Sequence, residues 1–236
     1  MEGAPSFPLH EAAREGKTLT IRGLLERDAG LANKKDEDGR TALFWALSSG
    51  NTEVASEILK KAKNLRSFDI DETDEAGWTV LHIAASTGNL QAIKELIMPL
   101  EPAINAQTNS GSTPLHFAVS KGHVEVVKYL LDNGVSPRLK DKQEQNALHR
   151  AASVGNLPIV QLLIDAKCPL NATDRTNWTG LHHALAEGHG DVAIAIVKAG
   201  GDLDRADNEG HTPYDVACND GVSKYVQEQL SQSNNA

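Results

Sequence analysis

The sequence has few aromatic residues, only two cysteines and no long apolar run. Phe, Trp and Tyr together make up 4% of its 236 residues, and Cys168 and Cys218 lie far apart in the chain. A scaffold held together by several disulfides is therefore excluded. No stretch reaches the roughly 18 apolar residues of a membrane-spanning helix. With no apolar signal after Met1, we expect a reducing compartment and a protein that is cytoplasmic and nuclear.

Basic residues are also too few for an electrostatic grip on nucleic acid. The chain has 23 Lys and Arg against 32 Asp and Glu, which gives a formal net charge of -9. Phosphate contacts need clustered cationic side chains. We therefore expect no nucleic-acid or membrane partner, and the charge favours a protein partner with basic patches.

What the sequence does contain is a short phrase that returns seven times. Its third residue falls at intervals of 34, 38, 34, 33, 33 and 33 residues, at Leu9, Leu43, Leu81, Leu115, Leu148, Leu181 and Tyr214. A period near 33 that carries T-P-L-H-x-A resembles the ankyrin repeat, a turn followed by two antiparallel helices. The resemblance implies an all-α ankyrin-repeat solenoid of seven helix-turn-helix units with protruding β-hairpin loops.

The unbroken period predicts a single ankyrin-repeat domain over 1–236, because each unit of such an array packs against its neighbours. The outer two units are expected to act as caps, and the units are placed near 5–37, 38–73, 74–110, 111–143, 144–176, 177–208 and 209–232. Four residues are added between Leu43 and Leu81, in a stretch that carries Asp69, Asp71, Glu72, Asp74 and Glu75. A hydrated loop and a docking edge for a basic partner are both open interpretations of these acids.

The clearest unit, near Asn109 to Asp141, predicts how each repeat is built. The Thr113 hydroxyl can cap the first helix, Pro114 suits its first position, and Gly122 permits a left-handed exit. The histidine of the phrase returns in most units, so we interpret it as a hydrogen-bonding residue of the turn. These histidines are His10, His82, His116, His149 and His182.

The sequence offers no chemistry of a catalytic site. No grouping of Cys, His and carboxylate residues has zinc-ligand spacing, and no Gly-rich phosphate loop precedes a Lys and a Ser or Thr. We expect no catalytic residue, no cofactor, no metal site and no enzymatic activity.

Longer strings resemble one group of ankyrin proteins. They are DEDGRTALFWALSSGNTE, EAGWTVLHIAASTGNL, RLKDKQEQNALHRAASVGNL and ALAEGHGDVA. In these strings the chain is similar to the gankyrin family, including fungal-type ankyrin-repeat assembly chaperones of the proteasome regulatory particle. The resemblance implies a non-enzymatic protein, monomeric when free, whose concave face binds the C-terminal domain of a AAA ATPase subunit and delays docking on the core particle. The alternative is an ankyrin-repeat inhibitor or adaptor of a kinase or transcription factor.

Contacts with a partner are expected at the hairpin tips and on the exposed side of the first helices. Trp78 and Trp178 occupy the tip position before the Thr, and Trp45 lies on a first helix. Large aromatic residues are typical interface hot spots; the other interpretation is that each indole folds back over a neighbouring hairpin. Phe44 departs from the pattern, since it stands where the phrase has His. The predicted partner-binding residues are Asp38, Arg40, Trp45, Glu75, Trp78, Lys121, Glu144, Arg150, Trp178, His183 and Glu187.

Overall fold

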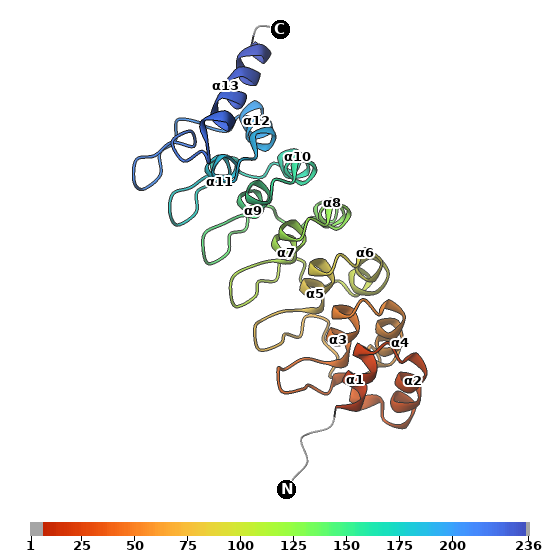
Figure 1. Ribbon diagram of the computed structural model, residues 1–236. Coiled ribbons are helices and arrows are strands. Elements are labelled where there is room, and N and C mark those ends of the chain that lie inside the picture. The colour runs from red at the N-terminus through yellow and green to blue at the C-terminus, as the bar shows by residue number, and fades with distance from the viewer. Residues whose placement is uncertain (1–6, 235–236) are drawn as a thin grey trace. The chain divides into compact units, whose positions relative to one another are not determined.

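The computed structural model describes residues 7–234, which form two compact units, 7–109 and 110–234 (Figure 1). Both units consist of antiparallel helix pairs joined by loops, as the repeated phrase predicts, and no β-strand is present within 7–234. No helix in this part of the chain is both long enough and apolar enough to cross a bilayer. The all-α expectation is confirmed, and the protruding loops are closed by turns rather than by strand ladders.

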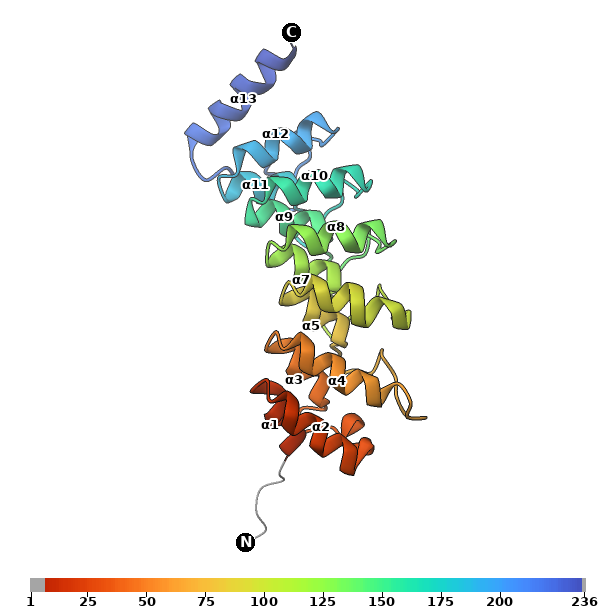
Figure 2. The ribbon, with the colours of Figure 1, turned by 90° about the vertical axis from the view of Figure 1, so that its right-hand side faces the viewer.

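In each unit the pairs follow one another in chain order (Figures 1 and 2), and the long loops project from the side of the first helices (Figure 1). The first unit contains α1 (Pro8–Arg14), α2 (Thr18–Arg27), the 3-10 turn η1 (Ala29–Asn33), α3 (Ala42–Ser48), α4 (Thr52–Ala62), α5 (Val80–Ser86) and α6 (Leu90–Ala92). The second unit contains α7 (Pro114–Ser120), α8 (Val124–Asp132), α9 (Ala147–Val154), α10 (Leu157–Asp165), α11 (Gly180–Ala186), α12 (Gly190–Lys198) and α13 (Asp220–Asn234).

The first helices begin and end as the sequence predicts. The Thr113 hydroxyl accepts from the His116 N–H, and the Thr113 N–H donates to His116 Nδ1 at 3.1 Å, which together form a capping box. Pro114 takes the first helical position, where no backbone donor is needed. Gly122 has a φ of 74°, the left-handed conformation that lets the chain turn into α8.

The core of each unit is made of the leucine of the phrase and an apolar stripe on the second helix. Leu115 and Leu148 are fully buried or nearly so, and in α8 the buried residues are Val126, Val127 and Leu130. Spacings of one and three along the helix put these three side chains on one face. The helix pairs therefore stack through aliphatic contacts and need few aromatic residues.

The third repeat carries one residue more than the fourth, and its second helix contains the extra residue as a π turn. After α6 the chain continues through the π segment η2 (Ile93–Ile97) and the 3-10 turn η3 (Met98–Leu100). Buried Ile93 and Ile97 are four residues apart, whereas the corresponding Val127 and Leu130 of α8 are three apart. A π turn keeps both isoleucines on the buried face despite the insertion.

This arrangement predicts that one residue can be removed from the third repeat without damage. Deleting the exposed Glu95 should restore α-helical spacing between Ile93 and Ile97 and change the free energy of unfolding by less than about 1 kcal/mol. Deleting the exposed Lys128 from α8 instead rotates Leu130 by about 100° and should cost about 2–5 kcal/mol. Urea unfolding of both variants tests the difference, and equal losses would contradict the π-turn explanation.

The seventh repeat, near 209–232, departs from the expected helix-turn-helix. Residues 212–217 form a turn instead of a first helix, with the Asp215 N–H donating to the Thr212 carbonyl at 3.0 Å. Asp215 stands where the phrase has His, and its carboxylate bonds back to the Thr212 N–H and hydroxyl at 2.8 and 2.7 Å. Asp215 thus makes the bond that His116 makes at the start of α7, and yet residues 212–217 form only turns. The unit is therefore α13 preceded by a turn.

The five acids in the lengthened stretch between the second and third phrases have different roles in the structure. Asp74 is buried and structural, so neither a hydrated loop nor a docking edge describes it. Asp71 accepts from the Ala103 N–H at 2.8 Å, and Glu72 pairs with Lys35 at 3.0 Å. Asp69 and Glu75 are exposed. The insertion is therefore fastened to the rest of the first unit.

Candidate partner-binding surface

Five of the projecting loops begin with an aspartate that fixes the loop's shape. These loop aspartates are Asp36, Asp74, Asp141, Asp174 and Asp207. In each, Oδ1 accepts from the backbone N–H groups two and four residues later; for Asp174 these are Thr176 at 2.9 Å and Trp178 at 3.0 Å. The Asp174 N–H also donates to the Trp178 carbonyl at 2.9 Å. One side chain thus organises a whole tip.

The second oxygen, Oδ2, of each loop aspartate is hydrogen-bonded to another side chain of the same compact unit, 7–109 or 110–234. Asp74 accepts from Arg40 Nε at 3.0 Å, and Asp174 bonds with His183 Nε2 at 2.9 Å. The side chains held in this way are, in chain order of the aspartates, Trp45, Arg40, Arg150, His183 and Trp178. All five belong to the predicted partner-binding set. The loops therefore orient these residues before any partner is present.

Hydrogen bonds stabilise the charged form of three loop aspartates, Asp36, Asp174 and Asp207. Burial alone would raise the pKa of Asp174, but bonds from Thr176, His183 and Trp178 outweigh it and hold the pKa below its usual value. The pKa of Asp36 is lowered in the same way, with the Trp45 indole as the first of its hydrogen-bond donors. The tips consequently carry fixed negative charges beside oriented aromatic and cationic groups.

The histidines of the phrase connect successive repeats, which confirms their predicted structural role. His149 Nδ1 accepts from the Asn146 N–H, and its Nε2 bonds with the Trp178 carbonyl in the next tip, both at 3.1 Å. His182 makes the matching bond to the His211 carbonyl at 3.2 Å, and His10 to the Arg40 carbonyl at 3.0 Å. His10, His149 and His182 therefore hold the tip residue of the following loop, whereas His82 bonds with the Ala106 carbonyl at 3.1 Å.

The tryptophans are half-buried, which lies between an exposed interface hot spot and an indole folded back over a neighbouring hairpin. The Trp178 indole donates to Asp207 of the following loop at 2.9 Å and stacks on His182, with ring centroids 5.9 Å apart. Trp45 donates to Asp36 at 2.7 Å, and the ring of Trp78 lies 6.1 Å from that of His82. Each ring packs against neighbouring residues and leaves part of its surface exposed to solvent.

Of the other predicted residues, five are exposed and make few contacts. They are Asp38, Glu75, Lys121, Glu144 and Glu187. Arg40 and Arg150 are instead committed to ion pairs with buried loop aspartates, Asp74 and Asp141. The Arg40 guanidinium is therefore already paired with an acid of its own chain, Asp74.

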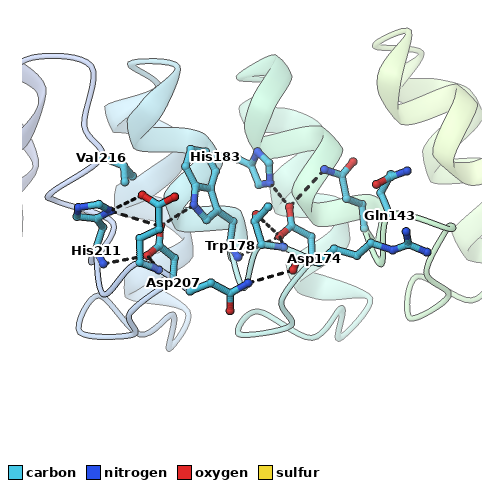
Figure 3. Close-up of a pocket in the computed structure, with 12 residues that line it drawn as sticks. Gln143, Asp174, Trp178, His183, Asp207, His211 and Val216 are labelled. Carbon is cyan, nitrogen blue, oxygen red and sulfur yellow. Dashed lines mark hydrogen bonds and ion pairs between the residues drawn. The ribbon is translucent and has the colours of Figure 1, made fainter.

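A groove of about 700 Å³ opens among the last three loops of the second unit (Figure 3). Asp174 and Trp178 come from one loop, Asp207 and His211 from the next, and His183 projects from α11. The remaining lining residues are Gln143, Gln145, Arg175, Thr176, Asn208, Glu209 and Val216. Adjacent loops are joined by single backbone bonds, such as Arg175 N–H to the Gln143 carbonyl at 3.1 Å. The groove is thus an open, acidic and partly aromatic surface.

Comparison with known proteins identifies the architecture. The family described as ankyrin repeats (3 copies) matches residues 3–69, 57–141, 127–207 and 148–234. The chain belongs to the ankyrin-repeat family. The ankyrin repeat domain of human ASB11, in its crystal structure, has the same fold, with a TM-score of 0.77 at 23% identity over 89% of this chain and 91% of that one.

Two curated relatives are proteasomal, in agreement with the gankyrin-type resemblance. The probable 26S proteasome regulatory subunit p28 of Saccharomyces cerevisiae is 44% identical over 141 residues, 59% of this ankyrin-repeat chain and 61% of that protein. The 26S proteasome non-ATPase regulatory subunit 10 of Homo sapiens is 38% identical over 61 residues, 25% of this chain and 27% of that protein. The chain thus matches about three fifths of the yeast relative's length.

The loop aspartates shape the candidate surface, although the sequence analysis did not include them among the predicted partner-binding residues. They precede the third residue of the ankyrin phrase, a leucine in four cases and Tyr214 in the last, by seven residues, so they recur with the same period as the histidines. Aspartates two and four residues before free N–H groups are a known turn signal.

Proposed function

We propose that this ankyrin-repeat protein is an assembly chaperone of the proteasome regulatory particle. It binds the C-terminal domain of a AAA ATPase subunit through its tip loops and first helices, on the face that is concave in such arrays, and delays docking on the core particle. The observation that carries the proposal is the 44% identity over 141 residues to the yeast proteasome regulatory subunit p28. The protein works in the cytoplasm and nucleus, as a monomer when free and without enzymatic activity.

The chemistry of the tips supports a protein partner with mixed charges. The loop aspartates orient half-buried tryptophans and arginines, and exposed acids such as Asp38, Glu144 and Glu187 surround them. Orienting these side chains beforehand reduces the conformational entropy lost on binding. Charges at defined positions set register and disfavour wrong partners.

Affinity capture with mass spectrometry tests the proposal against its alternative. The tagged chain, expressed in its own cells, should enrich one proteasomal ATPase subunit and be missing from assembled particles capped on the core. Capture of a kinase or transcription factor without proteasomal ATPases would favour the inhibitor or adaptor instead. The control is a variant with reversed charge at a loop tip, Glu75→Arg. Glu75 is exposed and belongs to the predicted partner-binding residues, so specific capture of the ATPase subunit should weaken in this variant.

Trp78→Ala should weaken binding of the ATPase domain by about 1–3 kcal/mol, because an indole at an interface is a typical hot spot. Thermal unfolding should change little, since the ring is only half-buried. Calorimetric titration and a thermal melt measure the two effects. Intact affinity with a large loss of stability would assign Trp78 to the packing of the first unit.

A further inference from the structure

The loop aspartates differ in the side chains that pair with them. Asp74 Oδ2 is paired with Arg40, and Asp141 Oδ2 with Arg150, so each of these carboxylates has a guanidinium of the same unit as its partner. Asp174 and Asp207 occupy the same position in later repeats. Within the described part of the chain their ion-pair partners are histidines, His183 at 2.9 Å and His211 at 3.8 Å.

Both of these carboxylates keep an accepting position that is weakly used. Asp174 Oδ2 has one short bond, to His183, and one long one, to Gln145 Nε2 at 3.5 Å. Asp207 Oδ2 has one short bond, to Trp178 Nε1 at 2.9 Å, and the distant His211. Their side chains are 7% and 6% exposed, and both line the groove of Figure 3. A buried carboxylate that is not paired with an arginine or a lysine favours a cation placed beside it.

The first unit shows how a guanidinium fits beside such a carboxylate. Arg40 donates from Nε to Asp74 and at the same time lies over the indole of Trp45, with its Cζ 5.5 Å from the ring centre. A loop aspartate and a tryptophan thus form the two walls of one arginine site. In the groove, Asp207 and Trp178 offer the same pair of groups.

We propose that the groove of the second unit binds an arginine side chain of a partner protein. The guanidinium occupies the groove beside Trp178 and donates to the Oδ2 atoms of the loop aspartates that line it. This inference rests on the proposed function and deepens it, since it states the chemistry that the ATPase domain must bring to this end of the chain. It adds a contact that the predicted tip residues do not specify.

Three features of the groove favour an arginine side chain over other ligands: its charge, its partly exposed indole and its open mouth. Three carboxylates, Asp174, Asp207 and Glu209, line it against one exposed guanidinium, that of Arg175, so an anion is repelled. A planar guanidinium can stack on the indole while donating to carboxylates, whereas a lysine ammonium offers no plane. The open mouth of the groove suits a side chain carried on a folded surface.

Titration with a small probe tests the site without the ATPase. N-acetyl-arginine amide, added to the full chain, should shift the indole N–H signal of Trp178 in a nitrogen–proton correlation spectrum and leave that of Trp45 unchanged. N-acetyl-lysine amide at equal concentration should give a shift several times smaller. The indole signals are assigned by Trp178→Phe and Trp45→Phe. Sodium chloride at matched ionic strength is the reference.

A charge variant with a matched control sharpens the test. Glu209 is exposed and lines the groove, so Glu209→Arg should weaken the arginine probe by roughly threefold to fivefold. Glu228 is exposed on α13 outside the groove, and Glu228→Arg makes the same change in net charge. It should leave the titration unchanged.

The possible failures are separable. Equal shifts for the arginine and lysine probes, or equal effects of Glu209→Arg and Glu228→Arg, would overturn the arginine site even if the ATPase is captured. A selective Trp178 shift with no ATPase captured would support the site and remove the proposed partner. No shift at Trp178 up to the solubility of the probe would also overturn it.

Discussion

Lowering the pH from 7 to 5 should reduce the free energy of unfolding by about 4 kcal/mol, through two buried histidines. Burial is the main cause that lowers the pKa of His116 and of His149 from 6.5 to about 4. The Arg150 guanidinium contributes to the shift at His116, and His183 contributes at His149. Each histidine accounts for about 2 kcal/mol of the change at pH 5.

The sign follows from which state binds more protons. Above pH 6.5 both histidines are neutral in the folded and unfolded chains, so they impose no penalty. Between pH 6.5 and 4 the unfolded chain takes up protons that the folded chain excludes, and stability therefore falls as the pH falls. The lowered pKa of His10 and of His182 acts in the same direction. Asp36 and Asp174, whose pKa values are lowered, lose their contribution only at lower pH.

The hydrogen bonds explain why protonation is resisted. His116 Nδ1 accepts from the Thr113 N–H at 3.1 Å, and Nε2 bonds with the Gln145 carbonyl at 3.1 Å. These partners require the neutral ring with its proton on Nε2. A proton on Nδ1 would face the backbone donor and break the capping box at the start of α7.

Urea unfolding at pH 7.0 and 5.0 measures the effect, and His116→Phe is its control. The second repeat already carries a buried Phe44 at this position. His116→Phe should lower stability at pH 7 because the Thr113 N–H and the Gln145 carbonyl lose their partner. It should also remove about half of the pH dependence. An unchanged pH dependence would show that other groups titrate.

The sequence predicts the repeated parts of this structure well because they are repeated. The leucines, capping threonines and histidines recur with the period, and a role that fits His116 also fits His149. The contacts of these residues depend mainly on the geometry of one repeat and its neighbour, so a role inferred in one repeat applies to the next. The helical hairpins and the structural role of the histidines were predictable for this reason.

Non-repeated features depended on contacts that no local pattern contains. The π turn at Ile93–Ile97 could be inferred only by comparing the spacing of buried residues between repeats. The pairing of Arg40 with Asp74 joins residues 34 positions apart, and that of Trp178 with Asp207 joins residues 29 apart. The candidate site was therefore predicted as a set of tip residues, while the side-chain partners of the periodic loop aspartates could be found only in the structure.

Replacing Asp141 should destabilise the second unit by about 3–5 kcal/mol, because it leaves the buried part of Arg150 without its counter-charge. Asp141 is buried, and its Oδ1 also accepts from the Gln143 and Gln145 N–H groups at 2.8 and 3.0 Å. In Asp141→Ala these two donors lose their acceptor as well. The Arg150 guanidinium keeps only the Ser112 and Ser120 hydroxyls, at 3.0 and 3.2 Å.

A double-mutant cycle separates the ion pair from the loop's backbone bonds. Arg150→Phe places in α9 the residue type that Phe117 supplies at the same position of α7. If the unpaired charge dominates, Asp141→Asn should cost much less in the Arg150→Phe background than in the parent chain, with a coupling of about 1–3 kcal/mol. Asp132→Ala, at the exposed end of α8, should change stability by less than about 0.5 kcal/mol. Additive losses for Asp141 and Arg150 would show that the aspartate stabilises the loop alone and that the arginine is free for a partner.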